Sequence, residues 1–363
     1  MATIRDVAER AGVSRSTVSR YISGQGYVSP EARVRIVTAV EGLEFVPNAL
    51  ARGLKTRRSG LIALLVPEIV NSFYTTISRG VEDVANRQGL QVIVGNTDED
   101  VAKERTYVDL LVASQVDGVI VASAGRTARP LKSLLQKKVP TVLIDRGVDG
   151  FDSDLVKGDS VGGTVELTRH LLSLGHERIA FVNGALDTSV AREREEGFRR
   201  ALADAGLPVD ETLISAGTWF IEDAERRAKD LVAVKAPFTA ILAANNFMAI
   251  GVLRALRRAG IRVPEDVALV CFDDLEQAAE IDPFLTVMAQ PAYTMGTLAM
   301  QLLVERIDRR HQGPPRALTL APRLLVRRSC GTRSGLGDPG HDGLGDPAGQ
   351  AEIAAGLVPA GSV

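Results

Sequence analysis

The N-terminal region places apolar side chains at helical spacing, three or four positions apart. Thr3 and Asp6 form a capping-box pattern at the start of one helix, and Gly12 ends it. Ser14 can cap a second helix, whose apolar face can pack against the first. The apolar positions are Val7, Ala8, Ala11, Val18 and Ile22. The pattern predicts two short helices joined by a tight turn.

A third helix is predicted after Ser29, a cap followed by Pro30 in the first helical turn, where proline is favoured. Its apolar stripe consists of Ile36, Val37, Val40 and Leu43. Three such helices can enclose a small core of their own. We therefore expect a small all-α headpiece over residues 1–46.

Beyond Gly60 the pattern changes to short β-rich runs that alternate with longer amphipathic helices. Buried parallel strands are expected at residues 60–67, 90–96, 117–123, 141–146, 177–184, 212–219, 239–246 and 267–274. A helix from Phe73 to Gln88 separates the first two runs, and the series that starts at residue 177 opens in the same way. The repetition predicts two doubly wound α/β lobes with a ligand cleft between them.

Composition narrows the classes of protein. A chain of 363 residues with 45% hydrophobic residues allows roughly two to three domains. It has no apolar run near the length of a membrane span, and its start lacks the order of a secretory signal. Cys271 and Cys330 have neither disulfide-framework numbers nor metal-ligand spacing. We expect a cytoplasmic protein without metal, cofactor or membrane segment.

Charge is distributed unevenly along the chain. Residues 1–58 contain ten Lys and Arg against five Asp and Glu, a net of +5, whereas the whole chain carries −2 and the remainder therefore −7. Arg15, Ser16, Ser19 and Arg20 face outward from the second predicted helix. A basic helix-turn-helix with small hydroxyl side chains is typical of insertion into a DNA major groove. A surface helical hairpin that covers a core remains the alternative.

Several motifs, in this order, resemble transcriptional regulators of the lactose repressor and galactose repressor (LacI/GalR) family from Thr3 to about Arg328. They are "TIRDVAERAGVSRSTVSR", "YVSPEARVRI", "FVPNALARGLKTRRSGLIALLVP", "HLLSLGHERIAFVNG", "ANNFMAIGVLRALRRAGIRVPEDVALVCFDD" and "LTVMAQPAYTMG". The resemblance implies a helix-turn-helix headpiece joined to a core of two lobes that is similar to periplasmic binding proteins. The expected domains are 1–46, a hinge at 47–59, an effector-binding and dimerisation core at 60–328, and a disordered Gly/Pro-rich tail at 329–363.

The resemblance also implies how DNA is bound. Arg15 and Ser16 match the groove-reading pair, and arginine can form two hydrogen bonds to guanine. In the hinge, Leu54 matches a leucine that wedges between base pairs in the minor groove. The remaining expected DNA contacts are Ser14, Thr17, Ser19, Arg20, Asn48, Ala51 and Lys55. Ser23 departs from the usual Asn, which leaves any contact at that position open. A plain interdomain linker is the alternative for residues 47–59.

For the cleft, the resemblance implies a set of effector-binding residues. They are Phe73, Tyr74, Asp145, Arg194, Trp219, Asn245, Asp273 and Gln290. Hydrogen-bonding groups around one aromatic platform, Trp219, suit a polyhydroxylated ligand. Phe73 and Tyr74 could instead be core residues, Asp273 a loop cap and Trp219 the cover of a surface seam. Ser72 replaces the family's usual Pro, and Asn246 replaces its usual Asp, so the identity of the ligand stays open.

The expected function is that of a repressor whose affinity for a pseudo-palindromic operator is controlled by a small ligand, which we expect to be a sugar. The expected assembly is a homodimer, associated with the nucleoid when on DNA. Two alternatives belong to other classes. One is a transport-type sugar-binding protein, and the other is a serine hydrolase, because Gly158-Asp-Ser160-Val-Gly162 fits the G-x-S-x-G pattern. We expect no enzyme, since no histidine stands in a suitable context; Asp159 or Ser160 would then cap a helix.

Overall fold

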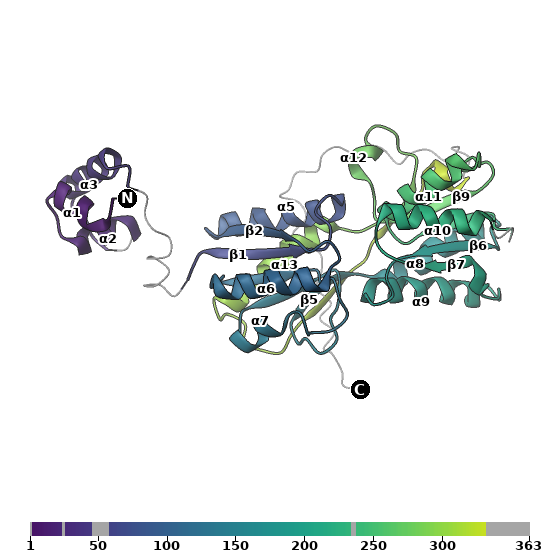
Figure 1. The fold of residues 1–363 in the computed structure, drawn as a ribbon, viewed down its shortest axis with the longest axis horizontal. Helices are drawn as coiled ribbons and strands as arrows, with labels where there is room; N and C mark the ends of the chain where they lie inside the picture. The colour runs from purple at the N-terminus through teal and green to yellow at the C-terminus, as the bar shows by residue number, and fades with distance from the viewer. Residues whose placement is uncertain (1, 24–25, 46–57, 234–236, 332–363) are drawn as a thin grey trace.

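The structure is a computed structural model that describes residues 2–23, 26–45, 58–233 and 237–331. Figure 1 shows a three-helix unit at the N-terminal end and two lobes, each with a sheet flanked by helices. The predicted fold class, an all-α headpiece with two doubly wound α/β lobes, is confirmed. No helix among the described residues is long and apolar enough to cross a membrane.

The headpiece consists of α1 (Ile4–Ala11), α2 (Arg15–Ser23) and α3 (Pro30–Gly42). The predicted capping box is present, because the backbone N–H groups of Asp6 and Thr3 donate to each other's side chains. Gly12 ends α1 in the left-handed conformation, φ 60°, which glycine adopts without strain. Ser14 Oγ accepts a hydrogen bond from the Thr17 N–H at 3.1 Å and so caps α2. The core of the headpiece consists of Val7, Ala8, Ala11, Val18, Ile36, Ala39 and Phe45.

The first lobe, as far as it is described, holds a six-stranded parallel sheet in the order β11-β5-β4-β3-β1-β2. Its strands are β1 (Leu61–Val66), β2 (Gln91–Asn96), β3 (Gly118–Val121), β4 (Thr141–Ile144), β5 (Asp154–Gly158) and β11 (Ala317–Leu320). Its helices are α5 (Ser72–Arg87), α6 (Val101–Ala113), α7 (Lys132–Lys137) and α13 (Ala292–Ile307). Ile62 and Leu64 of β1 pack with α5 and α13, whereas Ala63 and Leu65 pack with α6 and α7. Burial of both faces explains the continuous apolar run in the sequence.

The second lobe repeats this plan, with six strands among the described residues in the order β12-β10-β9-β8-β6-β7. Its strands are β6 (Ile179–Asn183), β7 (Ile214–Ala216), β8 (Ala240–Ala243), β9 (Ala268–Phe272), β10 (Thr286–Ala289) and β12 (Arg323–Leu325). Its helices are α8 (Ser160–Ser173), α9 (Ser189–Asp204), α10 (Ile221–Ala233), α11 (Asn246–Arg258), α12 (Glu276–Ala279) and the short 3₁₀ turns η1 (Glu211–Leu213) and η2 (Arg328–Cys330). Only β12 runs antiparallel to its neighbour in this described sheet.

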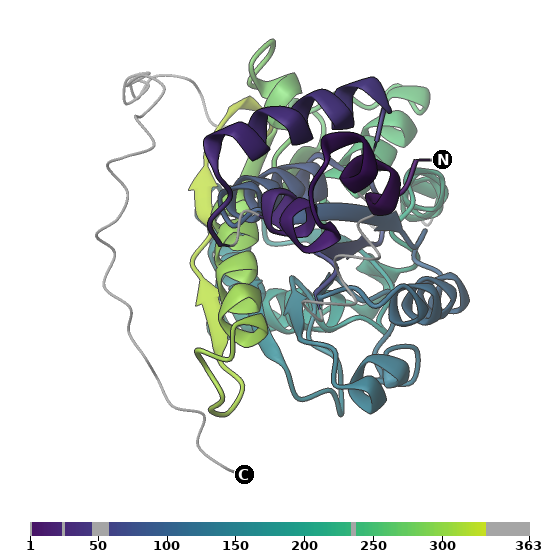
Figure 2. The same ribbon diagram turned by 90° about the vertical axis from the view of Figure 1, so that its left-hand side faces the viewer.

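Within residues 58–331 the chain passes three times from one lobe to the other: from β5 into α8, from β10 into α13 and from β11 into β12. Each connection is only a few residues long. The C-terminal strands β11 and β12 lie at one edge of the two sheets, where they are drawn in yellow-green to yellow (Figures 1 and 2). Short neighbouring connections allow two rigid lobes to change their mutual angle while each core stays packed.

Glycines bring the helix α5 into direct contact with α13. A Cβ added at Gly80 would stand 2.3 Å from the Tyr293 carbonyl oxygen, and one added at Gly296 would stand 2.2 Å from the Ile77 carbonyl oxygen. A real side chain does not fit at either distance. The same kind of contact joins α8 to α9 at Gly197, where a Cβ would meet the carbonyl oxygen of residue 161 at 2.5 Å.

The structure corrects two of the sequence predictions about the fold. The strand at residues 90–96 is parallel but not buried, because β2 is an edge strand on which Ile93 and Val94 are 46% and 39% exposed. The described core does not end at Arg328, since Ser329 is buried and donates to the Leu269 carbonyl oxygen at 2.5 Å. The predicted tail therefore cannot begin at residue 329, and its remainder from 332 on lies outside the described residues.

Candidate functional site

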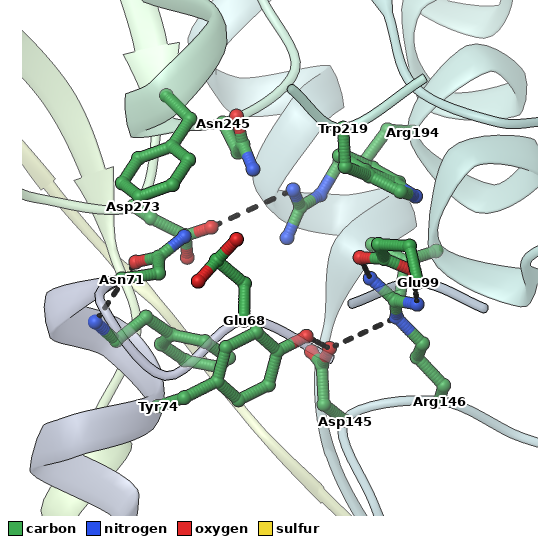
Figure 3. A pocket seen from close by; sticks show the side chains of 13 residues that line it. Glu68, Asn71, Tyr74, Glu99, Asp145, Arg146, Arg194, Trp219, Asn245 and Asp273 are labelled. Carbon is green, nitrogen blue, oxygen red and sulfur yellow. Dashed lines mark hydrogen bonds and ion pairs between the residues drawn. The ribbon is translucent and has the colours of Figure 1, made fainter. Parts of the chain in front are cut away.

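A cleft opens where the carboxyl ends of the strands in both lobes meet. Its volume is about 370 Å³, including the open space at its mouth. It is lined (Figure 3) by Glu68, Asn71, Phe73, Tyr74, Glu99, Asp145, Arg146, Val190, Arg194, Trp219, Asn245, Phe247 and Asp273. Its position, at the carboxyl ends of the strands, is that of small-molecule sites in open α/β folds.

The first-lobe wall is one hydrogen-bonded network. The Tyr74 hydroxyl donates to Asp145 Oδ2 at 2.9 Å. Arg146 donates to the two carboxylate oxygens of Glu99 at 2.6 and 2.7 Å, and to the Ser123 carbonyl oxygen at 3.2 Å. Burial raises the pKa of Tyr74 well above its ordinary value, so the hydroxyl keeps its proton. These contacts position the polar side chains of this wall.

The second-lobe wall is built around Arg194, which α9 presents and which is only 2% exposed. Its Nη1 donates to the Ala244 carbonyl oxygen at 2.5 Å and lies 3.6 Å from Asp273 Oδ2. Its guanidinium carbon stands 4.0 Å from the ring centroid of Phe272, while its Nε has no hydrogen-bond partner in the described structure. Burial raises the pKa of Asp273 to about 6, although the Arg194 charge opposes this shift.

Trp219 lines the cleft, but its ring is not the open platform that the sequence suggested. The Arg146 guanidinium carbon lies over the ring, 5.4 Å from its centroid, which is too close for a sugar to enter between them. The backbone of Gly184 also lies against the indole, since a Cβ there would be 2.4 Å from Cε2. The indole N–H, by contrast, has no partner among the described residues. Trp219 is therefore better placed to donate a hydrogen bond than to stack.

Two asparagine side chains join the lobes at the cleft. Asn71 Nδ2 donates to Asn246 Oδ1 at 3.1 Å, and Asn246 Nδ2 donates back to Asn71 Oδ1 at 3.0 Å. Asn71 also caps α5, and the neighbouring Asn245 caps α11 through a bond from the Met248 N–H at 2.9 Å. The amide at position 246, where an aspartate was expected from the family, is what permits the reciprocal pair, because a carboxylate has no N–H to donate.

Gln290 does not line the cleft, which corrects its predicted place among the pocket residues. It lies behind Asp273, and its Nε2 donates to Asp273 Oδ1 at 2.7 Å. Its side chain occupies the space beside Gly158, where a Cβ would be 1.9 Å from Gln290 Oε1. Gly158 ends β5 and Gln290 follows β10, each at the start of a connection between the lobes, so this contact links the cleft to these connections.

Seven of the eight predicted cleft residues line the pocket together. The sequence reasoning missed Glu68, Asn71, Glu99, Arg146, Val190 and Phe247. A signal was available for some of them: Arg146 follows Asp145 at the end of a predicted strand, and Glu68 and Asn71 stand just before Phe73. Residues at the carboxyl ends of parallel strands share one edge of the sheet. Val190 and Phe247 had no comparable signal.

The headpiece presents the predicted DNA-reading side chains to solvent. Arg15, Ser16 and Arg20 are exposed on α2, and Ser14 is exposed just before it. Ser14 Oγ lies 2.7 Å from Ser16 Oγ and 2.8 Å from Thr17 Oγ1. Thr17 and Ser19 are partly exposed on the same helix. The hinge residues Asn48, Ala51, Leu54 and Lys55 lie outside the described residues.

The serine-hydrolase alternative has no support in the geometry. Ser160 is buried as the first residue of α8, and the preceding Asp159 caps this helix by accepting from the Gly162 N–H at 2.8 Å. His170 lies 3.3 Å from Cys330 Sγ, and His176 lies 2.9 Å from Thr239 Oγ1, so neither serves Ser160. The G-x-S-x-G match is a capped helix start.

Comparison with known proteins agrees with this architecture. A model described as bacterial regulatory proteins, lacI family, matches residues 3–48, and one described as a periplasmic binding protein-like domain matches residues 168–330. The HTH-type transcriptional repressor PurR of Photobacterium profundum is 33% identical over 331 residues, which are 91% of this chain and 98% of that protein. The chain belongs to the LacI family.

Other LacI-family proteins agree in sequence and in structure. The HTH-type transcriptional regulator DegA of Bacillus subtilis is 35% identical over 330 residues, 90% of this chain and 97% of that protein. A complex of the transcriptional regulator CelR with cellobiose is 34% identical with a TM-score of 0.69, covering 91% of this chain and 100% of that one. The lac repressor dimer bound to operator and the anti-inducer ONPF has 26% identity and a TM-score of 0.78, covering 91% and 99%.

This LacI-family chain is thus a DNA-binding transcriptional regulator with a ligand-binding domain, and not an enzyme. The headpiece that binds DNA in such regulators is present here as α1, α2 and α3. The transport-type alternative is therefore wrong, although the two lobes do share the fold of periplasmic binding proteins.

Proposed function

We propose that the protein represses transcription by binding a pseudo-palindromic operator as a homodimer, and that a sugar or sugar derivative in the cleft controls its affinity for the operator. The observation that carries this proposal is that both lobes line one cleft. A ligand there contacts groups from each lobe, so its binding depends on the angle between them. A ligand that binds two states unequally shifts the balance between those states.

The DNA side of the proposal assigns roles within the headpiece and the hinge. Arg15 and Ser16 read base edges in the major groove, and Leu54 enters the minor groove. Other residues set the register through phosphate or mixed contacts; they are Ser14, Thr17, Ser19, Arg20, Asn48 and Lys55. Ala51 is a further hinge residue that we place at the DNA. The net charge of +5 on residues 1–58 supports this assignment, because phosphate contacts dominate affinity for DNA.

The end of the hinge is fixed to the first lobe, which gives the proposed signal a path. Asp117, just before β3, accepts from the N–H groups of Ser59 and Gly60 at 2.7 and 2.8 Å. Arg58 lies 2.9 Å from Asp308 at the end of α13. A rotation of the first lobe therefore moves the attachment points of the DNA-binding segment directly.

The polar lining of the cleft favours a sugar as its ligand. The polar side chains that line the cleft include positively and negatively charged groups, which can donate and accept hydrogen bonds. Each ligand hydroxyl needs such a partner once water is expelled. The ring of Trp219 is covered by Arg146, which removes one of the aromatic surfaces of the cleft on which a planar base could stack. The cellobiose complex of CelR, a relative of similar fold, is consistent with a sugar.

Apolar side chains at one edge of the first lobe support a homodimer. Ile93 and Val94 are exposed on the edge strand β2, and Ile69 and Val70 are exposed in the adjoining loop. The Ile69 N–H donates to Asn96 at the end of β2, so the loop and the strand lie together. A two-fold axis beside this edge would bury the same patch on both subunits and would place two headpieces on a symmetric operator.

The test is whether a cleft ligand changes the affinity for the operator. Genomic operator fragments are selected by the full chain, sugars are screened by thermal shift, and operator affinity is then measured with and without each hit. The expected result is a change of roughly five- to 150-fold, the usual range of allosteric coupling. An equal affinity in both conditions for every ligand that binds would contradict the proposed regulation.

Arg194→Ala is expected to weaken ligand binding by roughly ten- to hundredfold, because hydrogen bonds to a charged group contribute about 1.5–3 kcal/mol. Titration calorimetry on the hits from the screen measures the change. Arg200→Ala, which removes an exposed arginine from the same helix, is the matched control and is expected to bind normally. Unchanged binding by the Arg194 variant, with its unfolding temperature intact, would place the ligand elsewhere.

A further inference from the structure

We propose that the cleft selects uncharged or amine-bearing polyols and excludes phosphorylated and carboxylated ones. In this proposal the Glu68 carboxylate accepts a hydrogen bond from an N–H or O–H group of the ligand. This inference rests on the proposed function, since it names the chemical class of the ligand that the cleft takes. It concerns a residue that the sequence analysis did not assign.

The first ground is the balance of charge in the cleft. Four carboxylates line it, on Glu68, Glu99, Asp145 and Asp273, against two guanidinium groups, on Arg146 and Arg194. The lining therefore carries two more negative than positive groups when all of them are ionised. Like charges that meet in a partly desolvated site repel strongly, because little water is left to screen them.

The second ground is that the other carboxylates are already engaged. Glu99 receives both terminal nitrogens of Arg146. Asp145 accepts from the Tyr74 hydroxyl and lies 3.7 Å from Arg146 Nε. Asp273 accepts from Gln290 and faces Arg194.

Glu68 differs from the other three carboxylates. Its Oε1 accepts one backbone N–H, that of Val70, at 3.3 Å, and no cationic group of the described chain lies within 4.0 Å of it. Figure 3 shows its carboxylate in the middle of the cleft, between Tyr74, Asp273 and Arg194. A carboxylate without a counter-charge that faces the cavity favours a ligand that donates a hydrogen bond or carries a positive charge.

The third ground is that side chains already accept N–H groups at the helix starts around the cleft. The N-terminus of a helix attracts anions through its free N–H groups. At α5, however, Asn71 Oδ1 accepts the Phe73 N–H at 3.0 Å, and at α11 Asn245 and Asn246 accept two further N–H groups. Thr188 caps α9 in the same way. Neutral side chains thus already use some of the N–H groups that a phosphate or a carboxylate would address.

Two side chains that line the cleft carry a donor without a partner among the described residues, and a hydroxyl oxygen is a suitable acceptor for each. Arg194 Nε and the Trp219 indole N–H are buried and without partners in the described structure. Arg194 is the one guanidinium that a ligand anion could address, but Asp273 at 3.6 Å already balances its charge. A polyol can accept from these donors and can donate to Glu68 with a second hydroxyl or an amine, which satisfies both sides of the cleft.

The experiment measures binding of matched ligand series to the full-length protein by thermal shift and calorimetry. Each series contains a free sugar, its phosphate ester, its uronic acid and its amino sugar; the parent sugars are glucose, galactose, mannose, ribose and cellobiose, with the available derivatives of each. At least one free or amino sugar is expected to bind, and its phosphorylated and carboxylated forms are expected to bind at least a hundredfold more weakly.

Glu68→Gln tests the residue itself. It is expected to weaken the amino sugar at least tenfold and to reduce the discrimination against the phosphate ester by a similar factor. The control is Glu177→Gln, which removes an exposed carboxylate just before β6 in the second lobe. It is expected to change neither the affinity for the amino sugar nor the discrimination against the phosphate ester. Equal discrimination by the Glu68 variant and the parent protein would remove Glu68 from the proposal.

A phosphate ester or uronic acid that binds as tightly as its free sugar would overturn the proposed selectivity. The absence of any response in all series would overturn the ligand class as a whole. Operator affinity, measured on the same preparations, separates these failures from a failure of the proposed function. If operator binding persists while the ligand series fail, the repressor assignment stands and only the ligand class is wrong.

Discussion

A protein that lacks residues 1–59 is expected to bind an operator duplex at least about a thousandfold more weakly than the full chain, the usual difference between specific and non-specific binding. The removed part carries the net charge of +5 and the exposed groups of α2, whereas residues 60–363 carry −7 in total. A negatively charged remainder repels the phosphates. We therefore expect the truncated protein to lose both sequence reading and non-specific affinity.

The measurement is duplex affinity as a function of salt for the full and the truncated protein. The full chain is expected to show a steep decrease of affinity with salt, because binding releases counterions from the DNA. The headpiece and the lobes form separate hydrophobic cores, so the lobes should remain folded and should still bind the ligand. Persisting operator binding by the truncated protein, with a similar dependence on salt, would refute the assignment of DNA binding to the headpiece.

Arg15→Ala in the full chain is the finer version of this test. It is expected to cost about 1–3 kcal/mol at the cognate operator, if Arg15 reads a guanine, and much less on an unrelated duplex. An equal loss on both duplexes would indicate a phosphate contact instead. The comparison therefore separates base reading from positioning.

Gly296→Ala is expected to lower the free energy of unfolding by about 3 kcal/mol, at the upper end of the usual cost of overpacking. The added methyl group would stand 2.2 Å from the Ile77 carbonyl oxygen. A backbone atom cannot rotate away as a side chain can, so α5 and α13 would have to separate. Their separation would disturb the buried Met295 and Ala299 in the same core.

Urea unfolding followed by circular dichroism measures this loss. Gly147→Ala is the matched control, because its Cβ would find only Leu155 Cδ2 at an ordinary 3.8 Å and its backbone is not in the left-handed region. The control is expected to change the stability by less than about 0.5 kcal/mol. If Gly296→Ala were equally harmless, the close approach of the two helices would not be a constraint on the fold.

Local patterns were sufficient for much of the fold. The capping box of Thr3 and Asp6, the stop at Gly12 and the buried face of α5 all follow from residues within one or two helical turns of each other. The pattern did not show that β2 would be an edge strand. Its apolar composition resembles that of a buried strand, and only the strand order reveals that one side lacks a neighbour.

The candidate site was predictable for residues that stand in recognisable motifs and not for those whose role depends on a distant partner. Arg194 and Asp273 were found through their motifs, whereas Glu68 and Arg146 were missed. The sequence placed Trp219 correctly in the cleft. It did not show that the indole ring is covered, because the covering residue, Arg146, stands 73 positions earlier in the sequence. No periodicity relates two such positions.

The sequence by itself determined the headpiece, the two α/β lobes, the concentration of positive charge at the N-terminal end and the family. These properties depend on short-range spacing, on capping and on composition. The tertiary structure alone decided which carboxylates are neutralised, that Asn71 and Asn246 join the lobes, that Gln290 stands behind the cleft, and that Glu68 faces it without a counter-charge. Charge pairing and burial arise between residues that are far apart in the chain, and folding must bring them together before either exists.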